Sequence, residues 1–126
     1  MAKTKKREFG DIGEDIVCKF LLRKGYKIIE RNYLKPWGEI DIIAENDKSL
    51  VFVEVKSVSR EGGSRESFRP EENLHPRKLK RLYRAIQTYL LEKKVPESKV
   101  WRIDLASVFM DFSIRKARVE VIENIS

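Results

Sequence analysis

The stretch LVFVEVKS, residues 50–57, begins as a buried strand and ends in charge. Side chains alternate between the two faces of a strand, so Glu54 and Lys56 follow the apolar side chain of Phe52 on one face. The intervening valines occupy the other face. Both faces therefore begin apolar, which is typical of a strand that is covered on both sides. A carboxylate and an ammonium that continue an apolar row are unusual on such a strand, and their presence has to be explained.

The remaining pattern predicts two helices and four further strands around this segment. Apolar residues at helical spacing predict helices over about 11–24 and 76–94; Gly25 stops the first, and Pro76 starts the second. Strands are predicted over 26–33, 38–45, 49–56, 100–108 and 117–122, and ENDK forms the turn of a hairpin. Residues 57–75, rich in Ser, Gly, Arg and Glu, are predicted as a long loop. This order indicates an α/β fold with a mixed central sheet of about five strands flanked by helices.

Length and composition narrow the class of protein. The 126 residues suit one domain, expected over 9–126 after a basic tail at 1–8. A single cysteine, Cys18, excludes an intrachain disulfide and a cysteine-rich zinc site. No apolar run is long enough to cross a bilayer, and no secretory signal is apparent, so we expect a cytoplasmic protein without a membrane partner. The net charge of +7 favours a polyanionic partner.

The hairpin brings acidic residues to the end of the buried strand. With a two-residue turn at 46–47, Asp41 pairs with Phe52 and Glu39 with Glu54, so Asp41 and Glu54 become diagonal neighbours on one face. Uncompensated buried carboxylates are costly, which favours a cation between them. The alternative is a charged strand end that emerges into water.

Such a pair indicates a hard cation and the chemistry that it supports. Mg²⁺ or Mn²⁺ is commonly held by one or two carboxylates and water, and it assists phosphodiester hydrolysis. Lys56 beside the pair is suited to orient the attacking water or to stabilise phosphoryl charge. In the first predicted helix, Glu14 lies partly toward the sheet, although a first-turn acid is also favoured by the helix dipole.

These residues resemble a known nuclease pattern. Asp41 and, after twelve intervening residues, Glu54-Val55-Lys56 resemble the PD-(D/E)xK signature, but Ile40 stands in place of its leading proline. Four longer segments resemble the bacterial YraN-like family, which is similar to archaeal Holliday junction resolvases: GEDIVCKFLLRKGYKIIERNY, GEIDIIAENDKSLVFVEVKS, PRKLKRLYRAIQTYL and WRIDLASV.

The resemblance implies a restriction-endonuclease-like fold and a set of site residues. Glu14, Asp41, Glu54 and Lys56 correspond to the expected active site, with Asp41, Glu54 and Glu14 as ligands of Mg²⁺ or Mn²⁺. It also implies a branched or structured DNA substrate and a homodimer, because resolvases of the similar group work as dimers. Asp104 matches a family position, and we interpret it as structural.

Basic residues of the loop and the second helix are candidates to contact nucleic acid. They are Arg60, Arg65, Arg69, Arg77, Lys78, Lys80, Arg81 and Arg84. No base-reading motif is apparent, which favours recognition of DNA shape. The leading hypothesis is a metal-dependent DNA endonuclease, and the first alternative is a non-catalytic nucleic-acid-binding module on the same fold. A third hypothesis is a partner-binding protein that uses the amphipathic helix 76–94.

Overall fold

The protein is an α/β domain in a computed structural model that describes residues 4–59 and 75–125. The elements are α1 (Lys5–Arg23), β1 (Lys27–Lys35), β2 (Gly38–Glu45), β3 (Leu50–Ser59), α2 (Pro76–Glu92), β4 (Trp101–Asp111) and β5 (Lys116–Ile122). The strands form one sheet in the order β1-β2-β3-β4-β5. β3 and β4 are parallel, and the other neighbouring pairs are antiparallel. The predicted five-stranded mixed sheet is confirmed, and the arrangement is consistent with a restriction-endonuclease-like fold.

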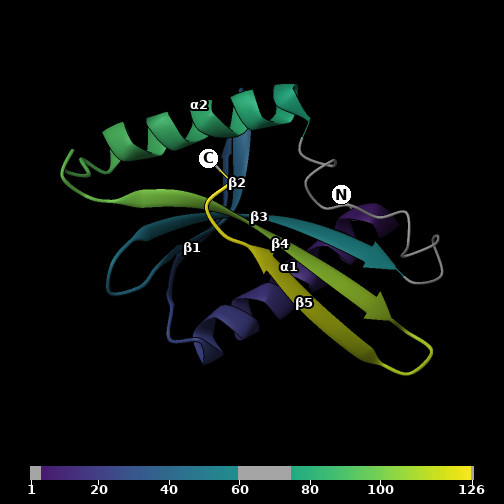
Figure 1. The fold of residues 1–126 in the computed structure, drawn as a ribbon. Helices are drawn as coiled ribbons and strands as arrows, with labels where there is room; N and C mark the ends of the chain where they lie inside the picture. Colours follow the sequence, from purple (N-terminus) through teal and green to yellow (C-terminus); the bar gives the residue numbers. More distant parts are fainter. Residues whose placement is uncertain (1–3, 60–74, 126) are drawn as a thin grey trace.

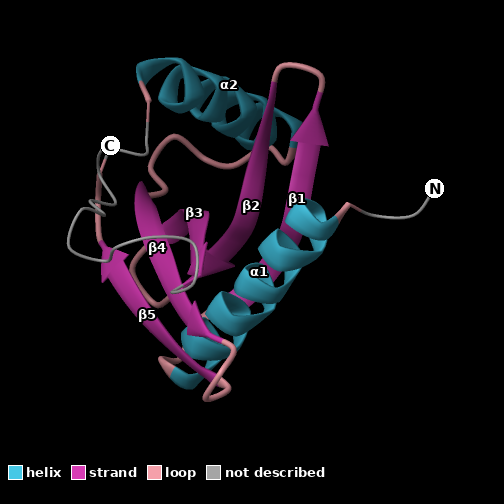
Figure 2. Cartoon of the chain, turned by 90° about the vertical axis from the view of Figure 1, so that its right-hand side faces the viewer, coloured by secondary structure: helices cyan, strands magenta, loops and turns pink. Residues whose placement is uncertain are grey.

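The two helices cover opposite faces of the sheet (Figures 1 and 2). On the α1 side, Val17 and Leu21 pack with Val53 of β3. On the α2 side, Leu82 and Ile86 pack in one cluster with Phe52. β3 therefore has a buried core on each face, as its apolar start predicts.

α2 connects two parallel strands and uses its apolar face within the domain. Its buried residues are Leu82, Ala85, Ile86 and Tyr89, and the ring of Tyr89 meets the ring of Phe52 edge to face at 5.7 Å. The amphipathic face on which the partner-binding hypothesis rested is thus occupied by the core of the chain itself.

α1 begins at Lys5 rather than near residue 11, so residues 5–8 are helical and do not belong to a tail. The Thr4 hydroxyl oxygen accepts a hydrogen bond from the Arg7 N–H at 3.1 Å and caps the helix. This cap supplies the start signal that the polar first turn lacks. At the other end Gly25 adopts φ 91°, and the Tyr26 N–H donates to the Leu21 carbonyl at 3.0 Å. The predicted stop at Gly25 is confirmed as a left-handed helix cap.

The register of the β2–β3 hairpin differs from the prediction by two residues. Glu45 pairs with Leu50 instead of Lys48, because the loop contains four residues rather than two. The Asn46 side-chain oxygen accepts the backbone N–H groups of Lys48 and Ser49 at 2.9 and 2.7 Å and shapes this longer turn. A shift of two residues preserves the faces of a strand but changes the partners across the ladder.

Three strands end later than predicted: β1 at Lys35, β3 at Ser59 and β4 at Asp111. β3 extends to Ser59, since it pairs in parallel with β4 as far as Ser59–Met110. The predicted loop over 57–75 therefore does not include residues 57–59, and its residues 60–74 lie outside the described chain.

Asp104, predicted as structural, is 2% exposed and accepts hydrogen bonds from Arg102 Nε at 2.9 Å and the Asn124 N–H at 3.0 Å.

We predict that Gly38→Ala lowers the free energy of unfolding by about 1–3 kcal/mol. A Cβ at this position would meet the backbone carbonyl oxygen of Arg81 in α2, which has no freedom to rotate away. Gly10→Ala is the matched control, because a Cβ there meets nothing within 4 Å and a helical alanine gains about 0.5–1 kcal/mol over glycine. Urea unfolding of both variants checks this. Equal stability of the two would contradict the packing described.

Candidate active site

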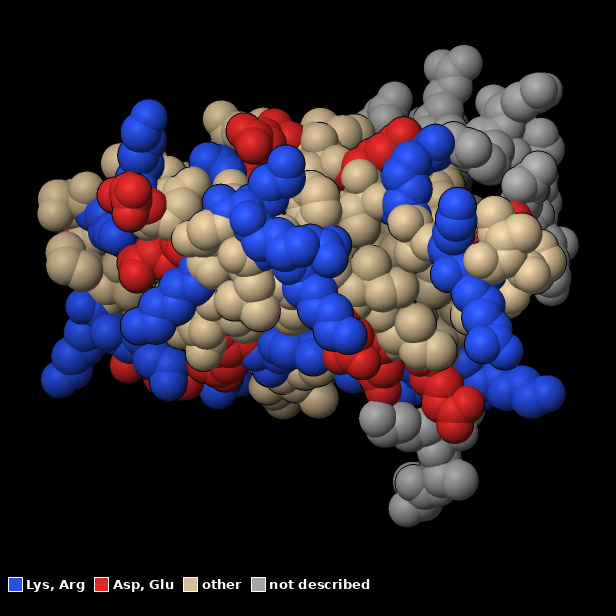
Figure 3. Space-filling model, turned by 90° about the horizontal axis from the view of Figure 1, so that it is seen from below, with Lys and Arg blue, Asp and Glu red and all other residues tan. Residues whose placement is uncertain are grey.

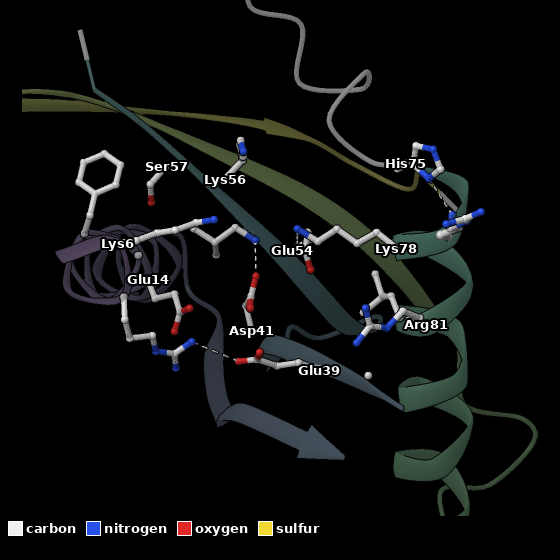
Figure 4. Close-up of a pocket in the computed structure, with 17 residues that line it drawn as sticks. Lys6, Glu14, Glu39, Asp41, Glu54, Lys56, Ser57, His75, Lys78 and Arg81 are labelled. Carbon is white, nitrogen blue, oxygen red and sulfur yellow. Dashed lines mark hydrogen bonds and ion pairs between the residues drawn. The ribbon is translucent and has the colours of Figure 1, made fainter. Parts of the chain in front are cut away.

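A cavity of about 610 Å³ lies between the start of α1, the edges of β2 and β3, and the start of α2. The four residues predicted as an active site, Glu14, Asp41, Glu54 and Lys56, all line it (Figure 4). Glu14 comes from α1, Asp41 from β2, and Glu54 and Lys56 from β3. The fold therefore brings the predicted set together in one place.

The sheet forks at this cavity. The pairs between β2 and β3 end at Ile42–Val53, whereas β2 stays paired with β1 down to Gly38 and β3 with β4 up to Ser59. Ile40 packs on the α2 side and Ile42 on the α1 side, although residues two apart in a regular strand share a face. The alternation of side chains between the two faces of β2 is therefore interrupted at the residue between them, Asp41.

Asp41 fills the fork with its side chain. Its Oδ2 accepts the backbone N–H of Val55 at 2.8 Å, so a carboxylate takes the place of the main-chain acceptor that β2 no longer provides. Continued past its last pair, Ile42–Val53, the observed register would place Asp41 opposite Glu54. The sequence-based pairing of Glu39 with Glu54 is thus wrong, and the two acids are aligned by the register rather than placed as diagonal neighbours.

Glu54 is buried and has two ionisable neighbours. It is 5% exposed, its Oε1 lies 2.7 Å from Nζ of Lys78 in α2, and its charge acts on the neighbouring Asp41 carboxyl group. The anomaly of a glutamate on the apolar Phe52 face is resolved at this point: the side chain points to the start of α2 at the edge of the core.

Burial raises the pKa of both carboxyl groups. Together with the negative charge of Glu54, burial raises the pKa of Asp41 to about 8. Burial also raises the pKa of Glu54, and the ammonium of Lys78 opposes that rise. With a pKa of about 8 for Asp41, the pair holds a proton at neutral pH rather than two full negative charges. The pair is therefore costly as two free anions and is suited to a positive charge.

Glu14 of α1 is a further buried acid that lines the cavity. It is 5% exposed, and its Oε1 lies 3.6 Å from Nη2 of Arg31 but has no hydrogen-bond partner. Burial raises its pKa, against the charges of Arg7 and Arg31. Gly13 allows this approach, because a Cβ there would collide with the hydroxyl of Ser57 on β3.

Lys56 lines the cavity from the end of β3 and extends away from Asp41 and Glu54 (Figure 4). Within the described residues its ammonium has no ion-pair partner. The ammonium of Lys78, in contrast, is paired with Glu54.

Other cavity residues were not predicted as site residues. Glu39 forms an ion pair with Arg7 at 3.7 Å, and Lys6 extends from α1 into the cavity (Figure 4). His75 caps α2 through its Nδ1, which accepts the Arg77 N–H at 3.1 Å. Pro76 at the first helical position was the available signal for this cap.

The predicted nucleic-acid contacts separate into three groups. Arg77, Lys78 and Arg81 line the cavity. Lys80 and Arg84 are exposed on α2 but do not line it, and the Arg84 guanidinium lies 5.1 Å from the centre of the Trp37 ring. The loop residues Arg60, Arg65 and Arg69 lie outside the described chain. On the face opposite α2, the described basic and acidic side chains are interspersed (Figure 3).

The donor set fits a hard divalent cation that keeps most of its water. In the described part of the chain no three Asp, Glu, His or Cys side chains are gathered as a complete metal-binding group. Mg²⁺, however, is typically bound by one or two carboxylates and several waters. Asp41 and Glu54 supply that number of carboxylates, and the buried Glu14 oxygen without a hydrogen bond offers an acceptor on the same cavity.

The model of the uncharacterised protein family UPF0102 matches residues 13–108, a span that includes Glu14, Asp41, Glu54 and Lys56. The chain belongs to this family. UPF0102 proteins of Campylobacter lari and Moorella thermoacetica are 37% and 38% identical to it over 118 and 123 residues. These alignments cover 94% and 98% of this chain and 93% and 98% of the relatives. The expected membership of the YraN-like family is confirmed at this level. None of the helices in the described residues is long and apolar enough to span a membrane.

We predict that Asp41→Asn stabilises the protein increasingly as pH rises. The pKa of Asp41 is about 8 in the folded chain against an ordinary 3.8, so the stability contributed by its bound proton is complete below pH 3.8 and lost through pH 8. Asparagine keeps an oxygen for the Val55 N–H and does not titrate. The free energy of unfolding of the variant should exceed that of the wild type by roughly 2–4 kcal/mol more at pH 9 than at pH 5.

Chemical unfolding across this pH range measures the difference. Asp47→Asn, which removes the same charge from an exposed turn position, is the control and should track the wild type. A constant difference between Asp41→Asn and the wild type would show that Asp41 is not held in its proton-bound form.

Proposed function

We propose that this protein is a divalent-metal-dependent endonuclease that hydrolyses phosphodiester bonds in branched or structured DNA. The observation that carries the proposal is the pair formed by Asp41 and Glu54 where β2 separates from β3. A fold gains nothing from two facing buried acids unless something positive compensates them. The DNA substrate would place the activity in the cytoplasm.

Each site residue has a role in this proposal. Asp41 and Glu54 bind Mg²⁺ or Mn²⁺, and Glu14 supports that ion through water or holds a second one. The bound ion would polarise the phosphate and lower the pKa of a coordinated water. Lys56, whose ammonium is not engaged by the described residues, positions the attacking water and stabilises the charge that develops on the phosphoryl oxygens.

The cavity has the charge distribution that a phosphodiester requires. Acidic side chains line it together with the described basic side chains of Lys6, Arg77 and Arg81. Such a rim binds backbone phosphates without reading bases, which supports selection by DNA shape. The resolvase-like substrate and a homodimer making two symmetric cuts are the finer part of the proposal and rest on the family resemblance.

A second candidate function is a non-catalytic nucleic-acid-binding module. The contact between Lys78 and Glu54 at 2.7 Å favours it, because an ion pair already compensates the acid without any metal. In that reading the acids are structural, and the basic rim alone binds DNA.

Cleavage of a labelled four-way junction tests the proposed activity, with linear duplex and single strand alongside. The wild type should cut the junction with Mg²⁺ or Mn²⁺ and not with EDTA. Lys56→Ala should lose at least about a hundredfold in rate, the lower range for a group that transfers protons or stabilises charge. Lys80→Ala is the control, since this lysine lies outside the cavity, and it should cut at nearly the wild-type rate.

Two outcomes would overturn the proposal in different ways. Binding of the junction without cleavage under any of these metals would favour the non-catalytic module. Cleavage that persists in Lys56→Ala would indicate a different site or a contaminating nuclease.

We predict that Arg77→Ala and Arg81→Ala each weaken DNA binding and reduce the slope of log affinity against log salt by about 1, the effect of one lost phosphate contact. Lys80→Ala and Arg84→Ala should change that slope less, because these residues do not line the cavity. Fluorescence anisotropy with labelled DNA at several salt concentrations measures the slopes. Equal losses in all four variants would contradict the placement of the DNA over the cavity.

A further inference from the structure

Lys78 occupies the carboxylate on which the proposed metal site depends. Its Nζ lies 2.7 Å from Oε1 of Glu54, and the lysine side chain is 53% exposed while the glutamate side chain is 7% exposed. The lysine reaches across from the first turn of α2, a separate element from β3, and meets the acid at the cavity (Figure 4). The contact thus joins a largely exposed lysine side chain to a buried glutamate.

A divalent cation and this ammonium would compete for the same carboxylate, that of Glu54. Of the oxygens on the two acids, Asp41 Oδ2 already accepts the Val55 N–H and Glu54 Oε1 accepts Lys78. A cation held between the acids would stand where positive charge is already present, and two positive charges side by side repel. Binding of a cation there would therefore favour release of Lys78 from Glu54.

The released ammonium has a destination in the same cavity. Lys78, Arg77 and Arg81 all line it from α2, and the exposed lysine stem has freedom to turn. A DNA phosphate beside the acids would accept the ammonium as Glu54 gives it up. The exchange keeps both groups paired before and after.

We propose that Lys78 is an internal competitor cation that couples metal binding to DNA binding. This inference rests on the proposed function, because it assigns a role toward the same metal site. Without DNA, Lys78 weakens the affinity for the metal. With DNA, a phosphate takes Lys78 and frees Glu54. By linkage, the metal strengthens DNA binding by the same factor by which DNA strengthens metal binding.

Titration with Mn²⁺, followed by the electron paramagnetic resonance signal of the free ion, tests the competition in the absence of DNA. Lys78→Met should bind Mn²⁺ about tenfold more tightly than the wild type, the factor that the loss of one charge-assisted hydrogen bond gives. Lys78→Arg keeps the charge and should remain close to the wild type. Lys80→Met removes the same charge from the same helix outside the cavity and should change the affinity little.

The outcomes separate this inference from the proposed function. Unchanged or weaker Mn²⁺ binding by Lys78→Met, with wild-type binding that is abolished by Glu54→Gln, would overturn the competitor role and leave the metal site intact. No Mn²⁺ binding by either the wild type or Lys78→Met would overturn both. Tighter binding by Lys80→Met equal to that of Lys78→Met would reduce the effect to general charge and would also contradict the inference.

Discussion

The hydrogen bond from the Val55 N–H to the Asp41 carboxylate is the interaction on which the candidate site depends. It stands where the β2–β3 ladder ends and the sheet forks, with β2 following β1 and β3 following β4. A backbone N–H at such a point needs an acceptor, and Asp41 provides it from the side chain. The same bond holds the Asp41 carboxyl group beside Glu54. The end of the β2–β3 ladder and the acidic pair therefore depend on one interaction.

The acidic pair is compensated by the ammonium of Lys78 and by a raised affinity for protons. Burial raises the pKa of both carboxyl groups, and Lys78 partly offsets the rise at Glu54. Around the pair, Glu14 lies near Arg31 and Glu39 near Arg7. Every acid of the cavity thus has a positive or proton-bearing neighbour, and a divalent cation would replace the compensation at the central pair alone.

Much of the fold followed from hydrophobic pattern. Both cores use the alternating faces of residues 50–53, and Pro76 and Gly25 marked a helix start and a helix end where the structure has them. The errors came from polar side chains that bond to the backbone. Asn46 lengthened the hairpin turn and shifted its register, and Thr4 started α1 earlier than its apolar residues indicate. Each signal was in the sequence but was weaker than periodicity.

The site was predictable in part for the same reason. The face shared by Glu54 and Lys56 depends only on alternation, which survives a register shift of two, so the predicted residues still meet. The partner of Glu54 did not follow, because Lys78 is distant in the sequence and its approach depends on where α2 crosses the sheet. The start of a crossover helix near the end of its preceding parallel strand was the available signal.

The most direct test of the proposed metal site is anomalous diffraction from crystals soaked in Mn²⁺. We expect a peak between the Asp41 and Glu54 carboxylates with the Lys78 ammonium moved off Glu54. Saturating Mn²⁺ that leaves no peak there, with Lys78 still on Glu54, would contradict it.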